Sequence, residues 1–257
     1  MPSLFDLGGK VALITGSTRG IGLAIARRFA EHGAKVVISS RKSDACERVA
    51  KEINSEFGSG QTVATAIPCN VNYKDQVENL IASSRKAFGQ IDILVCNAAV
   101  NPYQGPAAGI SEEAFDKTLT GNIKANHWLC YGVLPEMAER RDGSIIIISS
   151  YGGFRGQREL GTYALTKAAD MQMARNIVVE YSRYNIRANC IAPALIKTDM
   201  ARALWTNPEM LKRSTDMCPL GRIGEPDDIA GAAVYFASRA SAFTNGQTII
   251  CDGGISA

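Results

Sequence analysis

Short apolar, β-branched runs alternate with longer amphipathic stretches along the whole chain, and this alternation constrains the fold more than any other feature. The runs typical of strands span residues 11–15, 35–39, 62–67, 91–96, 144–149, 186–191 and 247–251. The stretches typical of helices span residues 20–32, 44–57, 74–88, 111–137, 162–183 and 226–238. Nearly continuous apolar strands that alternate with helices are typical of a parallel sheet covered by helices on both faces. The sequence therefore predicts an α/β fold.

No Pro-, Gly- or Ser-rich linker divides the 257 residues, so we predict a single dinucleotide-binding and catalytic domain over residues 1–257. One segment interrupts the alternation, because residues 193–219 form a long stretch, rich in Met and Leu, between the sixth strand and the last helix. Loops of this length in compact domains are usually functional. We therefore predict a substrate lid at about residues 193–219.

The formal charge of +3 is too small and too evenly spread to favour a nucleic acid or a membrane surface as partner. The sequence contains no run of 18 apolar residues, so we expect no transmembrane helix. Residues 1–10 lack the charged-then-apolar pattern of a signal peptide. Seven scattered cysteines are typical of reduced thiols, so we expect a cytoplasmic protein. Two isolated histidines cannot complete a zinc ligand cluster, and we expect no metal site.

A glycine-rich loop directly follows the first predicted strand. Glycine permits a tight turn and a close approach of the backbone to a pyrophosphate. The N-terminus of the following helix then offers free N–H groups and the positive end of its dipole to the phosphates. The loop therefore predicts a dinucleotide site formed by Gly16, Ser17, Thr18, Arg19, Gly20, Ile21 and Gly22.

The end of the second predicted strand distinguishes NAD from NADP. NAD-dependent enzymes usually carry an acid there, which binds the ribose 2′-hydroxyl. Here Ser40 and Arg41 follow the strand, and the first acid, Asp44, is placed to cap the next helix. Arg41, together with Arg19, has the forked donors that bind a 2′-phosphate. The alternative interpretation is that both arginines are ordinary exposed residues of turns. We predict a preference for NADP(H) over NAD(H).

Tyr163 and Lys167 are four residues apart in a predicted helix, so their side chains lie on one face. An ammonium beside a phenol favours the phenolate and lowers the pKa of the tyrosine. The pair is therefore a candidate acid/base catalyst that needs no histidine.

With the glycine loop, Asn97-Ala98-Ala99, Ser150 and Tyr163-x-x-x-Lys167, the sequence resembles the short-chain dehydrogenase/reductase family. The resemblance covers residues 10–254, and the motifs stand in the family's order and spacing. Residues 97–103 and 191–198 look closest to NADP(H)-dependent carbonyl reductases of the retinol dehydrogenase/reductase-like and tropinone reductase-like branch. The resemblance implies a Rossmann-type doubly wound fold, with a seven-stranded parallel sheet flanked by helices and the active site beyond the carboxyl ends of the strands.

The resemblance also implies catalytic roles. Tyr163 would give its proton to the carbonyl oxygen of the substrate, and Ser150 would stabilise the same oxygen by a hydrogen bond. Lys167 would bind the nicotinamide ribose and lower the pKa of Tyr163. Asn122 would organise a water through which protons reach Lys167; its alternative role is that of an ordinary helix-surface residue. Ser149 is expected on the opposite face of its strand.

Further cofactor contacts follow from the resemblance alone. The positions that match the family pattern are Asn70, Val71, Asn97, Ala98, Ala99, Pro193, Ile196 and Thr198, in addition to Tyr163 and Lys167. Asn70 replaces the usual aspartate beside the adenine, and Ala194 replaces the usual glycine after Pro193. Gly121 stands where the family more often has a bulkier residue, and the sequence offers no reason for it.

The side chains expected around the substrate are mostly apolar: Ser150, Tyr151, Phe154, Leu160, Leu195 and Trp205, with Met200 and Leu204 of the lid. This wall favours a neutral ketone, aldehyde or diketone over a sugar phosphate. Trp205 alternatively packs against another subunit or a core. The resemblance implies a homotetramer, with a homodimer as the alternative.

Three functions fit these motifs. The first is an NADP(H)-dependent carbonyl reductase, which interconverts a carbonyl and a secondary alcohol. The second is a 3-oxoacyl carrier-protein reductase, which shares every motif and needs a basic docking surface near the pocket. The third is a non-catalytic NADP-binding sensor or scaffold, although Asn122, Ser150, Tyr163 and Lys167 are all present.

Overall fold

The computed structural model describes residues 3–257, and the first two residues of the predicted domain lie outside the described residues. Seven strands form one parallel sheet in the order β3-β2-β1-β4-β5-β6-β7, which confirms the predicted α/β fold of the Rossmann type. The strands are β1 (Val11–Thr15), β2 (Lys35–Ser39), β3 (Ala64–Ala66), β4 (Ile93–Cys96), β5 (Gly143–Ile148), β6 (Ile186–Pro193) and β7 (Thr248–Cys251).

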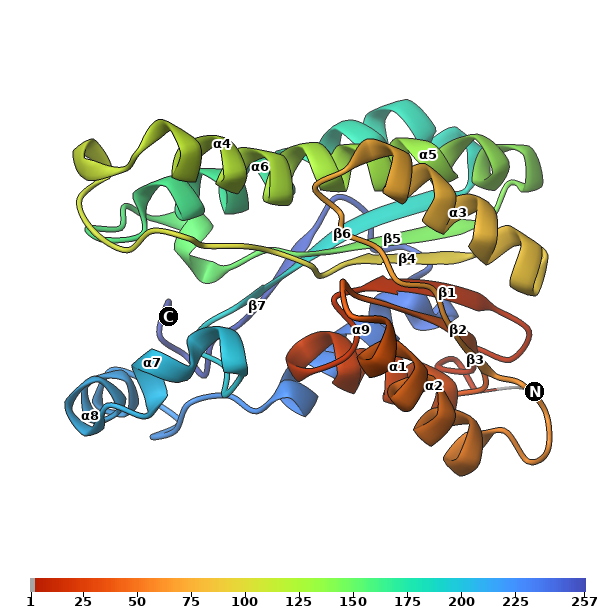
Figure 1. Cartoon of the computed structure of the whole chain (residues 1–257), viewed down its shortest axis with the longest axis horizontal. Coiled ribbons are helices and arrows are strands. Elements are labelled where there is room, and N and C mark those ends of the chain that lie inside the picture. Colours follow the sequence, from red (N-terminus) through yellow and green to blue (C-terminus); the bar gives the residue numbers. More distant parts are fainter. Residues whose placement is uncertain (1–2) are drawn as a thin grey trace.

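Helices cover both faces of this sheet. One layer contains α3 (Lys74–Phe88), α4 (Glu112–Leu119), α5 (Ala125–Arg140) and α6 (Gly161–Tyr181). The other layer contains α1 (Gly20–Glu31), α2 (Ser43–Phe57) and α9 (Pro226–Ala237) (Figure 1). Among the residues described, no helix is both long and apolar enough to cross a membrane.

Two hydrophobic cores lie on the two faces of the sheet, because successive side chains of a strand point to opposite sides. In β1, Ala12 and Ile14 belong to the core beneath α1, α2 and α9. Leu13, between them, belongs to the core beneath α3, α5 and α6. All three are fully buried. Burial on both faces explains why the strands carry apolar runs without polar alternation.

The predicted helix over residues 111–137 is interrupted in the structure. Ser111 caps α4 by accepting a hydrogen bond from the backbone N–H of Ala114, which confirms the predicted start. A π-helical turn, Thr120–Lys124, then separates α4 from α5, and the N–H of Ala125 bonds to the carbonyl of Thr120. The extra residue in this turn rotates the following helix, and such turns are frequent at functional sites.

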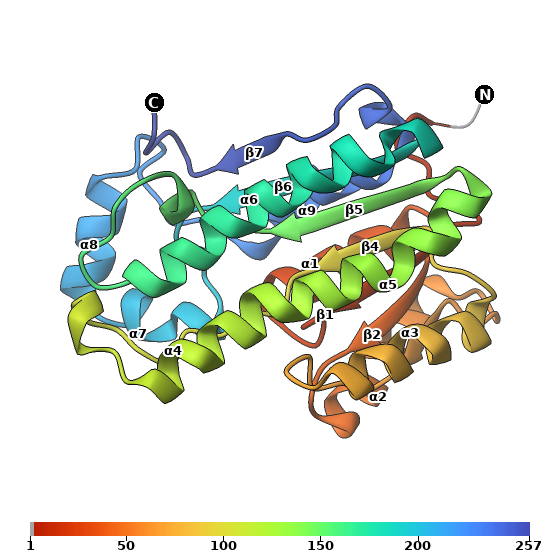
Figure 2. The same ribbon diagram turned by 90° about the horizontal axis from the view of Figure 1, so that it is seen from above.

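The segment predicted as a lid contains short helices rather than an irregular loop. After β6 the chain forms a 3₁₀ turn at Asp199–Ala201, then α7 (Arg202–Trp205) and α8 (Pro208–Asp216). Both helices lie at the end of the sheet to which the strand arrowheads point, beside the C-terminus (Figure 2). The segment therefore stands over the carboxyl ends of the strands, where open α/β sheets bind their ligands.

Candidate active site

The glycine loop has the backbone shape that a dinucleotide requires. Gly16 and Gly20 have φ values of +65° and +55°, a region that favours glycine. A β-carbon on Gly22 would stand 2.4 Å from the carbonyl oxygen of Gly16. The first turn of α1 therefore packs directly on the loop, and any side chain at position 22 would displace it.

Asn97 holds this loop from the neighbouring strand. Its side-chain Nδ2 donates to the carbonyls of Thr15 and Gly16, at 2.9 and 3.1 Å. The backbone N–H groups of Asn97 and Ala98 both donate to Oγ1 of Thr15. In the structure Asn97 thus fixes the loop, and Ala98 and Ala99 are half-buried. These residues fit a dinucleotide cradle.

Ser17 and Ile21, predicted as cofactor contacts, face the protein. Ser17 is buried, its Oγ donates to the carbonyl of Ile14 at 2.8 Å, and it accepts from the N–H of Ser39 at 2.9 Å. The half-buried side chain of Ile21 packs against the core beneath α1. Both side chains therefore support the loop, which leaves its backbone to meet a ligand.

The polar residues at the ends of β1 and β2 lie together. Oγ1 of Thr18 donates to Oγ of Ser40 at 3.2 Å, and Arg41 follows with an exposed side chain. Arg19 instead pairs with Asp199 at the start of the lid segment, at 3.2 Å between its Nη1 and Oδ2. Of the two arginines predicted to act together, Arg19 is thus paired with the lid segment, while the side chain of Arg41 is exposed beside Ser40.

The predicted adenine residues form a turn after β3. Oδ1 of Asn70 accepts a hydrogen bond from the N–H of Asn72 at 3.2 Å, and the N–H of Asn70 donates to the side chain of Gln76. Val71 is half-buried against the core beneath α3. The side chain of Asn70 therefore shapes the turn.

The residues after β6 approach the glycine loop. Pro193 is the last residue of the strand, and the buried Ile196 forms a parallel bridge with Gly224. Thr198 lies beside the loop, since a β-carbon on Gly20 would stand 3.1 Å from Cγ2 of Thr198. This segment therefore closes the predicted cofactor site on the side of the lid.

Lys167 and Tyr163 lie together on α6. The Nζ atom of Lys167 is 5.6 Å from the centre of the Tyr163 ring, and Lys167 is only 2% exposed. Nζ donates to the carbonyl of Ile148 at 2.7 Å and pairs with Oδ2 of Asp170 at 3.0 Å. Burial alone would lower the pKa of the Lys167 ammonium, but the charges of Asp170 and Tyr163 and the hydrogen bond to Asp170 together outweigh it, so this pKa is raised.

Ser150 lies at the end of β5 against the same helix. It caps a 3₁₀ turn, Tyr151–Phe154, and its Oγ accepts from the N–H of Gly152 at 3.1 Å. This turn packs on α6. Oγ of the neighbouring Ser149 donates to the backbone carbonyl of Lys167 at 2.6 Å, so Ser149 faces α6. Ser150, the next residue, is half-buried.

Asn122 is fully buried in the π-helical turn, so its alternative role as a helix-surface residue is wrong. Its Oδ1 accepts from the N–H of Val100 at 2.8 Å, and its Nδ2 donates to Oγ1 of Thr166 at 3.0 Å. The structure also explains Gly121, because a β-carbon there would stand 2.8 Å from a methyl of Val100 and 3.0 Å from Oδ1 of Asn72. The turn thus ties α6 to the loop after β4.

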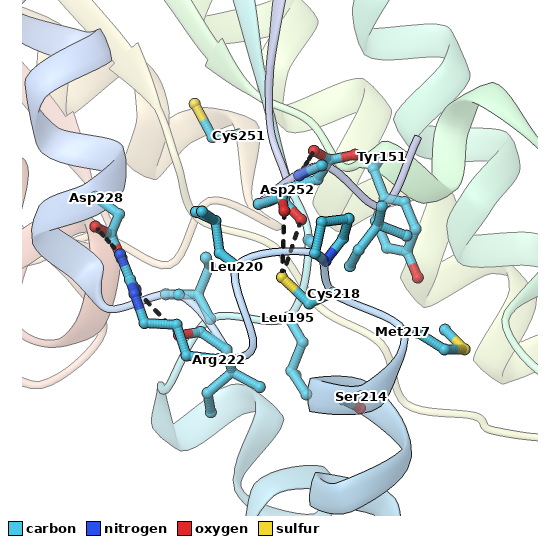
Figure 3. A pocket seen from close by; sticks show the side chains of 18 of the residues that line it. Tyr151, Leu195, Ser214, Met217, Cys218, Leu220, Arg222, Asp228, Cys251 and Asp252 are labelled. Atoms are coloured by element: carbon cyan, nitrogen blue, oxygen red, sulfur yellow. Dashed lines mark hydrogen bonds and ion pairs between the residues drawn. The ribbon is translucent and has the colours of Figure 1, made fainter. Parts of the chain in front are cut away.

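A cavity of about 580 Å³ opens between the lid segment and the C-terminal tail (Figure 3). Tyr151 and Leu195, two of the predicted substrate residues, line it. The C-terminal tail supplies lining that the sequence analysis missed, because no local pattern indicates that residues 252–255 return to the site. The remaining lining is mostly apolar and includes Ile196, Met217, Cys218, Pro219, Leu220, Ile223, Ile250 and Ile255.

Ser150 and the other predicted substrate residues do not line this cavity, and neither do Tyr163 and Lys167. Phe154 is 53% exposed, and Leu160 precedes the first turn of α6. The indole Nε1 of Trp205 donates to the carbonyl of Thr198 at 2.8 Å, with Nζ of Lys197 at 6.0 Å from the ring centre. Trp205 therefore holds the lid segment onto the residues that follow β6.

Asp170 and Asn126 are functional candidates that the sequence analysis missed. Asp170 is completely buried, and its Oδ1 accepts from Nδ2 of Asn126 at 2.9 Å. The available signal was the spacing, because Lys167 and Asp170 are three residues apart on one helix face.

Comparisons with known proteins agree over nearly the whole chain. A family model described as enoyl-(acyl carrier protein) reductase matches residues 16–256. Dehydrogenase/reductase SDR family member 4 from Homo sapiens is 40% identical over 248 residues, which cover 96% of this chain and 88% of that protein. The mitochondrial dehydrogenase/reductase SDR family member 2 from Homo sapiens is 38% identical and covers 96% of this chain and 86% of its own length.

A solved structure has the same fold as this chain. It is described as a gluconate 5-dehydrogenase from Burkholderia cenocepacia J2315 in complex with NADP and tartrate, and it is 34% identical with a TM-score of 0.92. The match covers 98% of this chain and 97% of the other. These relatives confirm two predictions, namely the family of the chain and that it is an enzyme. The chain belongs to the short-chain dehydrogenase/reductase family of NAD(P)-dependent oxidoreductases.

Proposed function

We propose that this protein is an NADP(H)-dependent carbonyl reductase that acts on neutral ketones, aldehydes or diketones. The observation that carries the proposal is the buried Lys167 ammonium, 5.6 Å from the Tyr163 ring. A fixed cation beside a phenol favours proton release from the phenol, which is the step that a carbonyl oxygen requires during reduction.

The bound nicotinamide would supply the hydride, and the protein would manage the oxygen and its proton. Tyr163 gives its phenolic proton to the carbonyl oxygen, and Lys167 stabilises the phenolate that remains. Ser150 donates to the same oxygen, where negative charge develops. Asn122 fixes the loop at Val100 and the hydroxyl of Thr166, which holds the helix of Tyr163 in place.

A preference for NADP(H) is supported by the end of β2. Thr18, Ser40 and Arg41 present two hydroxyls and one exposed guanidinium, without an acid at the strand end. Such donors suit a 2′-phosphate dianion. The similar gluconate 5-dehydrogenase described in complex with NADP is consistent with this cofactor.

A neutral substrate is supported by the charges around the cavity. Arg222 is the one cation among its described lining residues, and both of its terminal nitrogens bind the carboxylate of Asp228, at 2.6 and 2.9 Å. The carboxylate of Asp252 accepts from the N–H groups of Gly254 and Ser256. Arg222 and Asp228 are thus paired with each other, Asp252 is held by the backbone, and the apolar side chains remain for a substrate.

The test is NADPH consumption with a panel of neutral ketones, aldehydes and diketones, alongside an acetoacetyl thioester and gluconate with NADP⁺. We expect turnover on the neutral carbonyls and a loss on the order of a thousandfold in Tyr163→Phe. Preferred turnover of the thioester would favour the 3-oxoacyl carrier-protein reductase instead. Tight NADPH binding without turnover on any substrate would favour the sensor or scaffold.

We also propose a cytoplasmic homotetramer. The six buried cysteines and the half-buried Cys251 are all free thiols, which suits a reducing compartment. On α6, Leu165 and Val179 are exposed, and Phe243 after α9 is fully exposed. These three side chains are candidate contacts between subunits. Light scattering after size-exclusion chromatography tests it, and a monomer at micromolar concentration would contradict the assembly.

A further inference from the structure

Lys167 has little freedom in this structure. An ammonium has three N–H donors. One is directed to the carbonyl of Ile148 at 2.7 Å, and a second to Oδ2 of Asp170 at 3.0 Å. The third N–H has no acceptor of this kind among the described residues, and the centre of the Tyr163 ring lies 5.6 Å from Nζ. The two fixed bonds therefore decide which way the remaining donor points.

Asp170 is held as a carboxylate by its own partners. Both of its oxygens accept hydrogen bonds, Oδ2 from Lys167 and Oδ1 from Nδ2 of Asn126 at 2.9 Å. A protonated carboxyl would place a third proton between these donors. Burial raises the pKa of Asp170 above its usual range, and the ion pair with Lys167 and the amide of Asn126 offset that rise only in part.

We propose that Asp170 is a positioning residue for Lys167: its carboxylate fixes the ammonium in place and keeps it protonated before any ligand is bound. The inference rests on the proposed function, because it concerns how Lys167 serves Tyr163. A buried ion without a partner is strongly unfavourable. With Asp170 in place, Lys167 stays charged and aligned in the free enzyme, so the catalytic pair is assembled in advance.

The other titratable groups around the pair do not replace this carboxylate. Among residues 3–257, the titratable groups that surround the Lys167–Asp170 pair are Tyr163 on α6, Cys190 on β6, Cys96 on β4 and Cys130 on α5. The hydrogen bond with Cys130 and burial raise the pKa of Cys96, and burial raises that of Cys190. Both thiols are therefore neutral near pH 7, and Asp170 supplies the negative charge.

The experiment compares the pH profile of carbonyl reduction in the wild type and in Asp170→Asn. Without the carboxylate, burial dominates and lowers the pKa of Lys167, so the ammonium is lost at lower pH. We expect the alkaline limb of kcat to move down by about one pH unit or more. We also expect kcat to fall on the order of ten- to a hundredfold as alignment is lost. A profile that keeps its limb, with only a lower Tm, would overturn the inference.

Ser144→Ala is the matched control, because Ser144 is a buried polar residue whose Oγ donates to the carbonyl of Phe236, far along β5 from the site. It should lower the Tm without moving the pH profile. Tyr163→Phe separates the two proposals, because turnover in that variant would defeat the proposed function itself. An inactive Tyr163→Phe with an unshifted Asp170→Asn would defeat the role of Asp170 alone.

A measurement on the wild type decides the matter if Asp170→Asn fails to fold. The ¹³Cε signal of Lys167, assigned by its absence in Lys167→Arg, reports the charge of the ammonium during a pH titration. We expect it to remain charged beyond the ordinary lysine pKa of about 10.4. Titration below that value would show that Asp170 does not hold the charge, and would overturn the inference.

Discussion

Gly153 lies directly against the backbone of Lys167. A β-carbon on Gly153 would stand 2.8 Å from the carbonyl carbon of Lys167 and 2.9 Å from the amide nitrogen of Ala168. The 3₁₀ turn that Ser150 caps therefore touches α6 backbone to backbone. This contact sets the spacing between the hydroxyl of Ser150 and the helix that carries Tyr163.

Gly153→Ala should therefore reduce both stability and activity. The added methyl cannot be accommodated by a flexible side chain, so the turn must move away from α6. We expect a destabilisation of about 1–3 kcal/mol, the usual cost of overpacking, and a lower kcat because Ser150 moves with the turn. Thermal unfolding and NADPH turnover measure the two effects. Gly156→Ala is the control, because a β-carbon there would meet nothing within 4 Å.

Gly22→Ala should remove cofactor binding while leaving the chain folded. Its β-carbon would stand 2.4 Å from the carbonyl of Gly16 and 2.5 Å from Nδ2 of Asn97, so the loop loses its shape. Fluorescence titration with NADPH measures the loss. Gly231→Ala, in a helix and with open space around it, should keep binding and gain about 0.5–1 kcal/mol of stability. Unchanged NADPH affinity in Gly22→Ala would contradict this account of the loop.

The sheet and its helices could be predicted from the sequence because their causes are local. The β-branched runs that became β1 and β2 begin and end at the predicted residues, and the predicted α3 agrees at both ends. Glu225 and Asp228 form a capping box at the start of α9, where the predicted helix begins. Periodicity, capping residues and glycine positions carry this information without reference to the rest of the chain.

The site was predictable only where a motif encodes it. The π-helical turn at Asn122 was missed, because helical periodicity does not report one extra residue in a turn. The side chain of Lys167 was expected to face the ribose, yet two of its donors turn to Ile148 and Asp170. Which acceptor a long side chain chooses depends on packing between β5 and α6, and packing of this kind is not visible in the order of the residues.

Arg41→Asp should reverse the choice of cofactor if Arg41 binds the 2′-phosphate. An acid at this position would repel the phosphate and accept from the ribose 2′-hydroxyl. Loss of a charged hydrogen bond predicts a weaker NADPH affinity on the order of tenfold or more, with NADH affinity retained or improved. Kd values for both cofactors measure it.

Arg19→Ala provides the comparison, because Arg19 pairs with Asp199 in this structure. Arg19→Ala should change the ratio of the Kd values for NADPH and NADH less than Arg41→Asp does. An unchanged ratio in Arg41→Asp would remove the support for NADP(H).

Asp228→Asn should lower stability in a way that depends on pH. Oδ2 of Asp228 accepts from the N–H of Glu225 at 2.7 Å, and the carboxylate binds Arg222. The hydrogen bond from Arg222, followed by that from Glu225, lowers the pKa of Asp228. A carboxyl with a lowered pKa in the folded state stabilises the protein above its unfolded pKa of about 3.9. That stabilisation is lost as the pH falls through the lower, folded value.

The wild type should therefore exceed Asp228→Asn in stability at pH 7 by on the order of 1 kcal/mol, the usual worth of a helix cap. The exposed pair with Arg222 adds little to this difference. The difference should shrink as the pH falls below about 4 and close once the pH is below the folded pKa, where the wild-type carboxylate has taken up its proton. Urea unfolding at pH 7, 5 and 3 measures it, with Asp44→Asn at the start of α2 as the control acid. If the difference stayed the same at pH 3, the ionised carboxylate would not be its source, and the shape of the side chain alone would account for the cap.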